Sequence, residues 1–447
     1  MWTILSNVCV VSLGCAKNLT DSEVMLAKLH SQGYKLINDE SEAEIIIVNT
    51  CCFIDSAKQE SIDTIIDVAR NKKEGKLKYL IVAGCMGERF GQEILDELPE
   101  VDAVCGTGDF EDICDIINKA YAKRGVYIKG CMNAPLECNE RITATPPYTA
   151  YIKIAEGCDN KCTYCVIPSI RGSYRSRKLE NIVDEAKALA DNGVKELIVI
   201  AQDTSSYGVD IYSELSLAKL LKALCKIDKI EWVRVHYLYP EKITDELLET
   251  FKNEPKLVKY FDVPIQHISD RVLKRMGRRT TGSDIKNVIE KIRTYCPDAV
   301  IRTSLIIGFP GESEEDYSEL IEFLRQYKLE RVGVFPYSCE EGTPASKLDC
   351  QIDEDVKNER VQRLTEIIYE INDEILEEKI DTECRVLVEG KDNVLKMYFG
   401  RTYGDSIDVD PKVFFQSDKM FQPGDFVNIR VTDYIDSDLI GDIIDQE

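Results

Sequence analysis

The loop from residue 158 to residue 165 carries three cysteines at a spacing suited to iron. Its sequence is Cys158-Asp159-Asn160-Lys161-Cys162-Thr163-Tyr164-Cys165, which is the pattern C-x3-C-x2-C. Three thiolates on one loop can bind three irons of a cubane 4Fe-4S cluster and leave the fourth iron without a protein ligand. A structural zinc site would need a fourth Cys or His nearby, and a two-cluster ferredoxin would need a fourth Cys followed by Pro. Because the loop offers neither, the motif predicts a cluster with one open iron.

Three further cysteines lie far apart in the sequence, but each comes just after a predicted strand. Cys15, Cys51 and Cys85 follow the β-branched runs at residues 8–13, 44–49 and 78–83. Parallel strands end at one edge of a sheet, so these thiols can converge and bind a second cluster. The alternative is that they are small core residues, a common role for isolated cysteines. Cys52 adjoins Cys51 and could compete with it for the same iron.

The elements around these cysteines indicate an α/β protein with three folded regions. Residues 1–132 alternate strand and helix patterns, which predicts a doubly wound parallel sheet, and a proline-containing linker follows at 133–148. Residues 149–380 are predicted to form a partial (β/α)6 barrel with its functional residues at the carboxyl ends of the strands. Its strands are expected at 150–155, 196–201, 232–239, 260–265, 300–307 and 331–337, and a long helix at 353–379. Residues 381–447 are predicted to form a small antiparallel β-barrel.

Composition restricts the class of partner. The chain has 447 residues, with 56 Lys and Arg against 80 Asp and Glu, and its net charge of -24 disfavours binding to phosphate backbones. Its 17 cysteines are an odd number, and no basic residue precedes Lys17, so a secretory signal is not indicated. No apolar run is long enough to span a bilayer. We therefore expect a cytoplasmic protein with reduced thiols, no membrane association and no direct binding to nucleic acid.

The cysteine loop resembles the signature of the radical S-adenosylmethionine (SAM) superfamily, in which an aromatic residue, here Tyr164, precedes the last cysteine. The resemblance implies that Cys158, Cys162 and Cys165 hold a cluster whose open iron binds SAM, and that electron transfer cleaves SAM to a 5′-deoxyadenosyl radical. Residues 302–312 look like the SAM-contacting segment of that superfamily. The SAM contacts that the resemblance implies are Tyr164, Gln202, Asp203, Gln266, Ser304 and Gly308. Glycines at strand ends are also ordinary turn residues.

The order of regions resembles the radical SAM methylthiotransferases over essentially the whole chain. The segments that carry this resemblance are residues 11–19, 49–54, 168–177 and 264–270. The last two are similar to the branch that attaches a methylthio group to an aspartate β-carbon in protein twelve of the ribosomal small subunit. This implies that Cys15, Cys51 and Cys85 hold a second 4Fe-4S cluster and that a flavodoxin- or ferredoxin-type protein supplies electrons. Ala16 and Cys52 depart from the family pattern, where Pro and Gly are common.

Charge favours the protein-modifying branch over a tRNA-adenosine methylthiotransferase. Residues 381–447, similar to the TRAM modules that carry RNA in relatives, hold seven Lys and Arg against fifteen Asp and Glu, a net of -8. Such a domain would repel tRNA and attract a basic ribosomal protein, although it could also be an ordinary solvated surface. A non-catalytic iron-sulfur carrier is a third alternative. We expect a monomer, and the basic run Arg171, Arg175, Arg177 and Lys178 either holds anions or forms a solvated turn.

Overall fold

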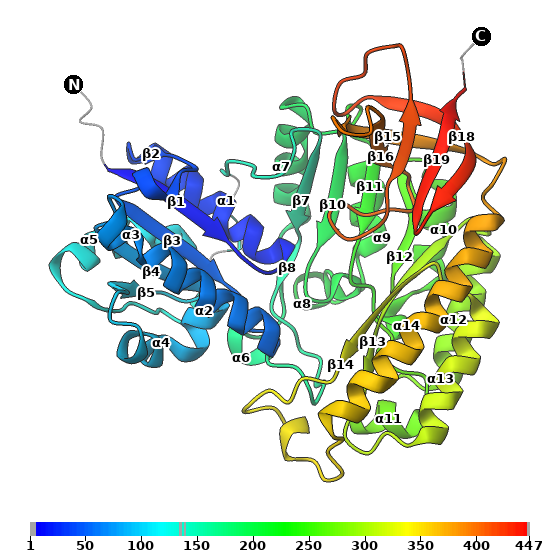
Figure 1. Ribbon diagram of the computed structural model, residues 1–447, viewed down its shortest axis with the longest axis horizontal. Coiled ribbons are helices and arrows are strands. Elements are labelled where there is room, and N and C mark those ends of the chain that lie inside the picture. The colour runs from blue at the N-terminus through cyan, green and yellow to red at the C-terminus, as the bar shows by residue number, and fades with distance from the viewer. Residues whose placement is uncertain (1–5, 134–135, 138–139, 445–447) are drawn as a thin grey trace.

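A computed structural model describes residues 6–133, 136–137 and 140–444 of the chain. Figure 1 shows the N-terminal domain on one side, the larger strand-helix domain in the centre, and the small C-terminal barrel beside the long helix α14 (Glu354–Glu377). In the part of the chain that the structure describes, no helix has the length and apolar character needed to cross a bilayer.

The N-terminal domain is a six-stranded parallel sheet in the order β2-β1-β3-β4-β5-β6, which confirms the predicted parallel sheet. Its strands are β1 (Asn7–Ser12), β2 (Lys35–Leu36), β3 (Ile45–Thr50), β4 (Tyr79–Gly84), β5 (Ala103–Val104) and β6 (Gly125–Val126). Its helices are α1 (Ala16–Ser31), α2 (Asp55–Ala69), α3 (Asn71–Glu74), α4 (Cys85–Glu97) and α5 (Ile113–Ala122). Apolar side chains of α2 and α4 pack on one face of the sheet and those of α1 and α5 on the other. Burial on both faces explains why β3 is an almost continuous apolar run.

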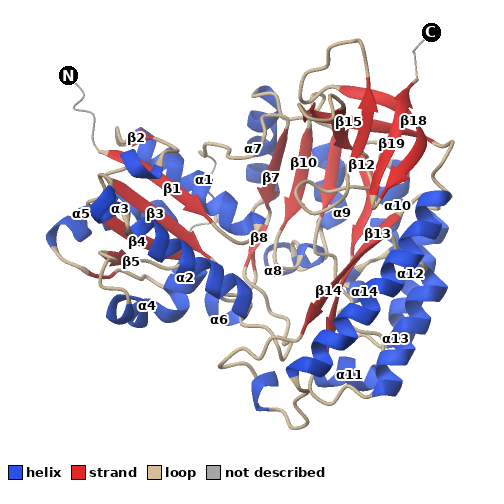
Figure 2. Cartoon of the chain, in the orientation of Figure 1, coloured by secondary structure: helices blue, strands red, loops and turns tan. Residues whose placement is uncertain are grey.

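The central domain is a six-stranded parallel sheet in the order β7-β10-β11-β12-β13-β14 that does not close between its outer strands. Its strands are β7 (Thr149–Lys153), β10 (Glu196–Ile200), β11 (Trp232–Val235), β12 (Leu257–Asp262), β13 (Val300–Ile307) and β14 (Arg331–Pro336). A short two-stranded sheet is formed by β8 (Ala155–Glu156) and β9 (Arg175–Ser176). The remaining helices are α6 (Ile167–Arg171), α7 (Leu179–Asp191), α8 (Val209–Tyr212), α9 (Leu217–Cys225), α10 (Asp245–Asn253), α11 (Asp270–Arg275), α12 (Gly282–Tyr295) and α13 (Glu314–Tyr327). Figure 2 shows helices covering the outer face, so the predicted partial barrel is confirmed.

The C-terminal domain is a closed barrel in the order β15-β16-β17-β19-β18. Its strands are β15 (Glu383–Lys391), β16 (Tyr398–Arg401), β17 (Val413–Gln416), β18 (Phe426–Ile435) and β19 (Asp438–Ile443). The expectation of a purely antiparallel barrel is wrong in one pairing, because β17 pairs with β19 in parallel. Strands β18 and β19 form a hairpin, and β19 then closes the barrel against β17.

A loop of the C-terminal domain fills the inside of the open barrel. Along each barrel strand alternate side chains face inward, and several of these inward groups contact residues 402–410, between β16 and β17. Ser406 Oγ lies 3.0 Å from His236 Nε2, and Tyr260 donates its hydroxyl hydrogen to Asp410 Oδ2 at 2.7 Å. Arg331 forms an ion pair of 2.6 Å with Asp405. Polar lumen residues are thus matched by polar groups of this inserted loop.

Candidate functional site

The cysteines of the N-terminal domain stand at one edge of its sheet. Cys15 precedes α1 directly after the β1 turn, Cys51 follows β3, and Cys85 is the first residue of α4. A Cβ on Gly14, whose φ is +84°, would lie 3.0 Å from Cys51 Sγ, so the Cys15 turn packs closely against the Cys51 thiol. The structure therefore places these thiols at neighbouring strand ends, as parallel topology predicts.

Polar side chains fix the geometry of this edge. Asn18 Nδ2 donates to the backbone oxygens of Leu13 and Thr50, at 3.1 and 2.8 Å. The Ser61 hydroxyl donates to Cys51 O at 2.8 Å and accepts the Cys51 N–H at 3.1 Å. Cys85 Sγ lies 3.5 Å from Asn18 Oδ1. Asn18 and Ser61 therefore tie the three strand ends together from α1 and α2.

Two cations, Lys17 and Arg171, lie close to the thiols of this edge. Arg171 Nη2 donates to Cys85 Sγ at 3.7 Å, although Arg171 belongs to α6 of the central domain. Burial raises the pKa of Cys15, but the ammonium of Lys17 and the guanidinium of Arg171 outweigh it and lower that pKa below its ordinary value. Burial raises the pKa of Cys85 to about 12, and the charge of Arg171 opposes the shift. Positive charge at this edge favours the thiolate, the form of cysteine that binds iron.

Cys52 occupies a different environment from Cys51. Its side chain is fully buried in the apolar core between the sheet and helices α2 and α4. Its backbone oxygen accepts a hydrogen bond from Arg89 Nη1 at 3.2 Å. Cys51 instead lies against the Cys15 turn. This difference favours Cys51 over Cys52 as the iron ligand.

The 158–165 loop leaves the barrel after β8 and is held by hydrogen bonds to two neighbouring segments. Cys158 N–H donates to Gly172 O at 3.1 Å, and Thr163 N–H donates to Met276 O at 2.9 Å. Asn160 Nδ2 and the N–H of Ile167 donate to the sulfurs of Cys158 and Cys165, each at 3.4 Å. Donors directed at cluster sulfurs are one means by which proteins tune an iron-sulfur cluster.

The donor set fits clusters better than a single ion. Every cysteine that the structure describes is a free thiol. Within the described residues, no three His, Cys, Asp or Glu side chains come close enough together to hold one metal ion. In a cubane each thiolate binds its own iron at a separate corner, so three thiols need not meet at a point. The assignment of both cysteine triads remains a prediction.

Of the expected SAM contacts, Tyr164 belongs to the cysteine loop itself, and the others lie in or just after three barrel strands: Gln202 and Asp203 after β10, Gln266 after β12, Ser304 in β13 and Gly308 after β13. Gln202 Nε2 donates to Glu156 Oε1 at 2.7 Å, while its buried Oε1 has no hydrogen-bond partner in the described structure. An orphaned acceptor of this kind suits a ligand that donates hydrogen bonds. Asp203 accepts hydrogen bonds from Asn160 Nδ2, at 2.8 Å, and from Ser206, so its carboxylate positions the cysteine loop.

The other expected contacts, Tyr164, Gln266, Ser304 and Gly308, each contact a neighbouring part of the barrel domain. Tyr164 packs edge-on against Phe309, with ring centroids 6.4 Å apart. Gln266 N–H donates to Ser304 O at 2.9 Å, which places these two residues side by side on neighbouring segments. Gly308 has a φ of +74°, and an added Cβ would lie 2.3 Å from Lys357 Cγ. Glycine at 308 is therefore required by close packing, whatever its relation to SAM.

Sequence reasoning missed a buried ion network between the N-terminal and central domains. Lys153 Nζ lies 2.6 Å from Asp21 and 2.8 Å from Glu156, and Arg171 Nη1 lies 2.7 Å from Asp21. Burial raises the pKa of Glu156, but Lys153 and Arg171 outweigh it and hold that pKa well below its usual range. Hydropathy gives no sign that these charged residues are buried. Their burial is tolerable only because they pair with opposite charges that lie far away in the sequence.

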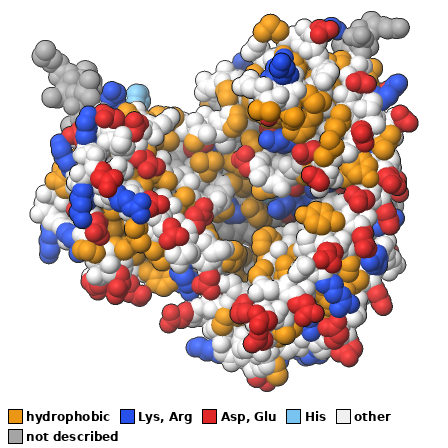
Figure 3. All heavy atoms as spheres, viewed as in Figure 1, with side chains coloured by type: hydrophobic (Ala, Val, Ile, Leu, Met, Phe, Trp, Pro, Cys, Tyr) orange, Lys and Arg blue, Asp and Glu red, His pale blue; other side chains and the backbone are white. Residues whose placement is uncertain are grey.

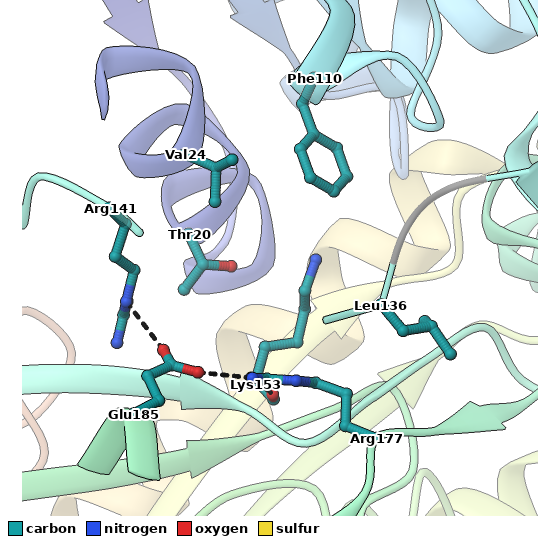
Figure 4. Close-up of a pocket in the computed structure, with 8 residues that line it drawn as sticks. All are labelled: Thr20, Val24, Phe110, Leu136, Arg141, Lys153, Arg177 and Glu185. Atoms are coloured by element: carbon teal, nitrogen blue, oxygen red, sulfur yellow. Dashed lines mark hydrogen bonds and ion pairs between the residues drawn. The ribbon is translucent and has the colours of Figure 1, made fainter. Parts of the chain in front are cut away.

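The basic run that follows the cysteine loop is not a solvated turn at Arg171 or Arg177. Both residues are at most 3% exposed. Figure 4 shows Glu185 between Arg141 and Arg177, with ion pairs of 2.9 and 2.6 Å. The guanidiniums of Arg171 and Arg177 are therefore both engaged with protein carboxylates, and Arg171 joins the two domains through Asp21. Arg278 was also missed: its Nη1 lies 3.9 Å from Cys162 Sγ, and no spacing pattern pointed to it.

Comparison with known proteins agrees with this division of the chain. Residues 152–324 match the Radical SAM superfamily, residues 7–106 match Uncharacterized protein family UPF0004, and residues 380–444 match the TRAM domain. The solved structure of the radical SAM methyltransferase TsrM from Kitasatospora setae, with cobalamin and a 4Fe-4S cluster bound, has a TM-score of 0.56 at 14% identity. It covers 76% of this chain and 77% of that one, and supports the fold alone.

Sequence relatives are much nearer. The ribosomal protein uS12 methylthiotransferase RimO of Clostridioides difficile (strain 630) is 48% identical over 98% of both chains. The RimO protein of Lachnoclostridium phytofermentans is 49% identical over 96% of this chain and 98% of its own. With this identity over nearly the full length and the radical SAM and TRAM regions in the same order, the chain belongs to the RimO family of radical SAM methylthiotransferases.

Proposed function

We propose that this protein attaches a methylthio group to the β-carbon of an aspartate in ribosomal protein uS12, using SAM and two 4Fe-4S clusters. The observation that carries the proposal is the Arg171 side chain, which extends from the cysteine-loop domain to Cys85 of the other triad. Because Arg171 follows Cys165 by only six residues, this contact supports the proposal that both sets of thiols lie near one domain interface. Cys158, Cys162 and Cys165 would hold the SAM cluster, and Cys15, Cys51 and Cys85 the sulfur-donating cluster.

An aliphatic C–H beside a carboxylate is too weakly acidic for a side-chain base. The bound cluster and SAM supply a carbon radical that can remove this hydrogen. The residues of the chain position the partners. Asn160 and Asp203 hold the cysteine loop, and Arg171 fixes the N-terminal edge relative to it through Asp21. Small displacements in such a site are costly, because reactivity depends strongly on distance and orientation.

The space between these domains is open on one side. Figure 3 shows the surface hollowed between the N-terminal domain and the central barrel. A loop of the substrate protein would enter there and reach the thiol edge and the cysteine loop together. The SAM contacts at Tyr164, Gln202, Asp203, Gln266, Ser304 and Gly308 are proposed on the same side. We also propose the domain limits 1–132, 149–380 and 381–447 on the basis of the sequence.

Charge on the C-terminal domain supports a protein substrate. Some of its charged residues are used internally, since Arg401 pairs with Glu196 of the barrel and Asp405 with Arg331. Asp433 on β18 and Asp436 in the turn between β18 and β19 stay exposed. These acids would attract a basic ribosomal protein and repel tRNA, which disfavours the tRNA-modifying alternative. A monomeric cytoplasmic enzyme that receives electrons from a flavodoxin- or ferredoxin-type protein completes the proposal.

Mass spectrometry tests this function directly. The anaerobically reconstituted enzyme, given SAM, a sulfide source and reductant, should add one methylthio group to purified uS12 at an aspartate. A strain that lacks the gene should contain unmodified uS12, and the restored gene should return the modification. Unmodified uS12 in the reconstituted reaction and in the strain with the restored gene, together with modified tRNA adenosine, would overturn the proposal.

A further inference from the structure

Lys17 differs from the other buried cations near the thiol edge. It lies in the first turn of α1, two residues after Cys15, and is only 8% exposed. Lys153 and Arg171 each have a carboxylate oxygen within 2.7 Å. Within the described residues, no carboxylate lies within ion-pair distance of Lys17 Nζ. Its ammonium instead lies over the ring of Tyr237, 3.5 Å from the ring centroid.

A buried ammonium needs compensation. Loss of hydration disfavours the charge strongly unless another group replaces the water. The face of a tyrosine ring provides part of that compensation, but less than a carboxylate does. One side of the Lys17 charge is therefore covered by the ring, and the charge interacts with the Cys15 thiol but has no carboxylate partner among the described residues. This arrangement suits a site that takes its anion from a ligand.

The surroundings of Lys17 hold the ammonium at the junction of the two domains. Tyr237 comes just after β11, at the carboxyl end of the barrel, and its φ of 62° is unusual for a residue with a Cβ. Its N–H donates to Asp262 Oδ2 at 3.0 Å, which helps to hold this conformation. Ile407, from the loop that fills the barrel, packs in the same cluster as Tyr237 and Leu19. Strained, well-supported residues of this kind gather at functional sites.

We propose that Lys17 binds the side-chain carboxylate of the aspartate that is modified. This inference rests on the proposed function and deepens it, because it names the group that would select aspartate. The β-carbon is bonded directly to that carboxylate carbon. A hydrogen-bonded ion pair with Lys17 would therefore hold the β-carbon near Cys15, at the junction of the two domains. Asparagine, which has the same shape without the charge, should bind poorly.

The test compares two versions of uS12 with each enzyme: the natural protein and one with the target Asp replaced by Asn. Binding to the full-length reconstituted enzyme is measured by fluorescence anisotropy, so that the readout does not need turnover. The wild-type enzyme should prefer the aspartate form by roughly tenfold to a hundredfold, the range for a charge-assisted hydrogen bond. In Lys17→Met this preference should fall to about twofold or less. The ratio is internal to each enzyme, so partial loss of cluster affects both versions equally.

Lys28→Met is the matched control, since Lys28 is on the same helix and its side chain is 38% exposed. It should keep the wild-type preference. Equal binding of the two uS12 versions by the wild-type enzyme would overturn the inference without any variant. So would an unchanged preference in Lys17→Met, which would leave Lys17 as a neighbour of Cys15 only. If wild-type enzyme fails to modify uS12 at all, the proposed function fails instead, so the two failures are distinct.

Discussion

The contact between the C-terminal domain and the barrel should depend on one buried carboxylate. Glu196, at the start of β10, is 0% exposed and lies between two guanidiniums. Its Oε1 is 2.9 Å from Arg234 Nε, and its Oε2 is 2.7 Å from Arg401 Nη2 on strand β16. Burial raises the pKa of Glu196, but the two arginines outweigh it and lower that pKa from 4.5 to about 2.

This shift sets both the size and the sign of a pH effect. A lowering from 4.5 to about 2, at 1.36 kcal/mol per pKa unit, corresponds to about 3 kcal/mol of folding free energy. Because the folded pKa is the lower one, the stabilisation is complete above pH 4.5 and is lost as the pH falls toward 2. Glu196→Gln keeps the shape and removes the charge. The substitution should therefore lower the free energy of unfolding by about 3 kcal/mol at pH 7. At pH 3.5 this difference from the wild-type protein should be smaller by about 1 kcal/mol.

Trp232 offers a local probe of this interface. The chain has only two tryptophans, and Trp232 of β11 packs edge-on against Phe426 of β18 at 4.9 Å. In a Trp2→Phe background, urea titration followed by Trp232 fluorescence would report release of the C-terminal domain. Glu231→Gln is the control, since Glu231 joins Arg385 across the same interface but is 41% exposed. The Glu231→Gln substitution should lower the free energy of unfolding by less than about 1 kcal/mol, because the ion pair is exposed to solvent. Equal effects of the two substitutions at pH 7, or a Glu196→Gln difference that grows on acidification, would refute this reasoning.

Three other outcomes follow from the site. Anaerobic reconstitution should give about eight irons per chain, and alanine at the three cysteines of the 158–165 loop should remove half of the iron and all SAM cleavage; a total near four in intact wild-type protein would show that the N-terminal cluster is wrongly assigned. Cys51→Ala should lose that cluster whereas Cys52→Ala keeps it, as measured by iron content, and the reverse result would exchange their roles. Reversal of the exposed Asp433 and Asp436 to Lys should slow association with uS12, most clearly at low salt, in stopped-flow measurements; an unchanged rate would exclude these acids from substrate capture.

Most of the fold could be predicted because local pattern and topology agree. The β-branched runs of both sheets are buried strands, and the helix expected at 353–379 is present as α14 (Glu354–Glu377). Cys15, Cys51 and Cys85 share an edge because parallel strands place equivalent ends together. Here a short-range signal, a cysteine after a strand, was sufficient to predict a long-range arrangement.

The parts that could not be predicted depend on contacts between distant residues. Arg171 is a surface residue by type, and its pairing with Glu156 and with Asp21, 150 positions away, makes its burial tolerable. The parallel pairing of β17 with β19 depends on how the last hairpin closes the barrel. Lys17 sits beside a predicted ligand, yet its significance comes from Tyr237, which approaches it from the other domain.

The loop between β16 and β17 changes how the C-terminal domain should be understood. Its Ile407 contacts the apolar cluster that contains Tyr151 and Ile198 inside the barrel, together with Leu19 of the N-terminal domain. The interior of the open barrel is therefore filled partly by its own side chains and partly by this loop. Removal of the domain would therefore expose the lumen and loosen the support beneath Tyr237 and Lys17. Loss of activity after such a truncation would not identify a substrate-binding role, so charge reversal on the exposed acids, which leaves the loop in place, is the change that separates recognition from support.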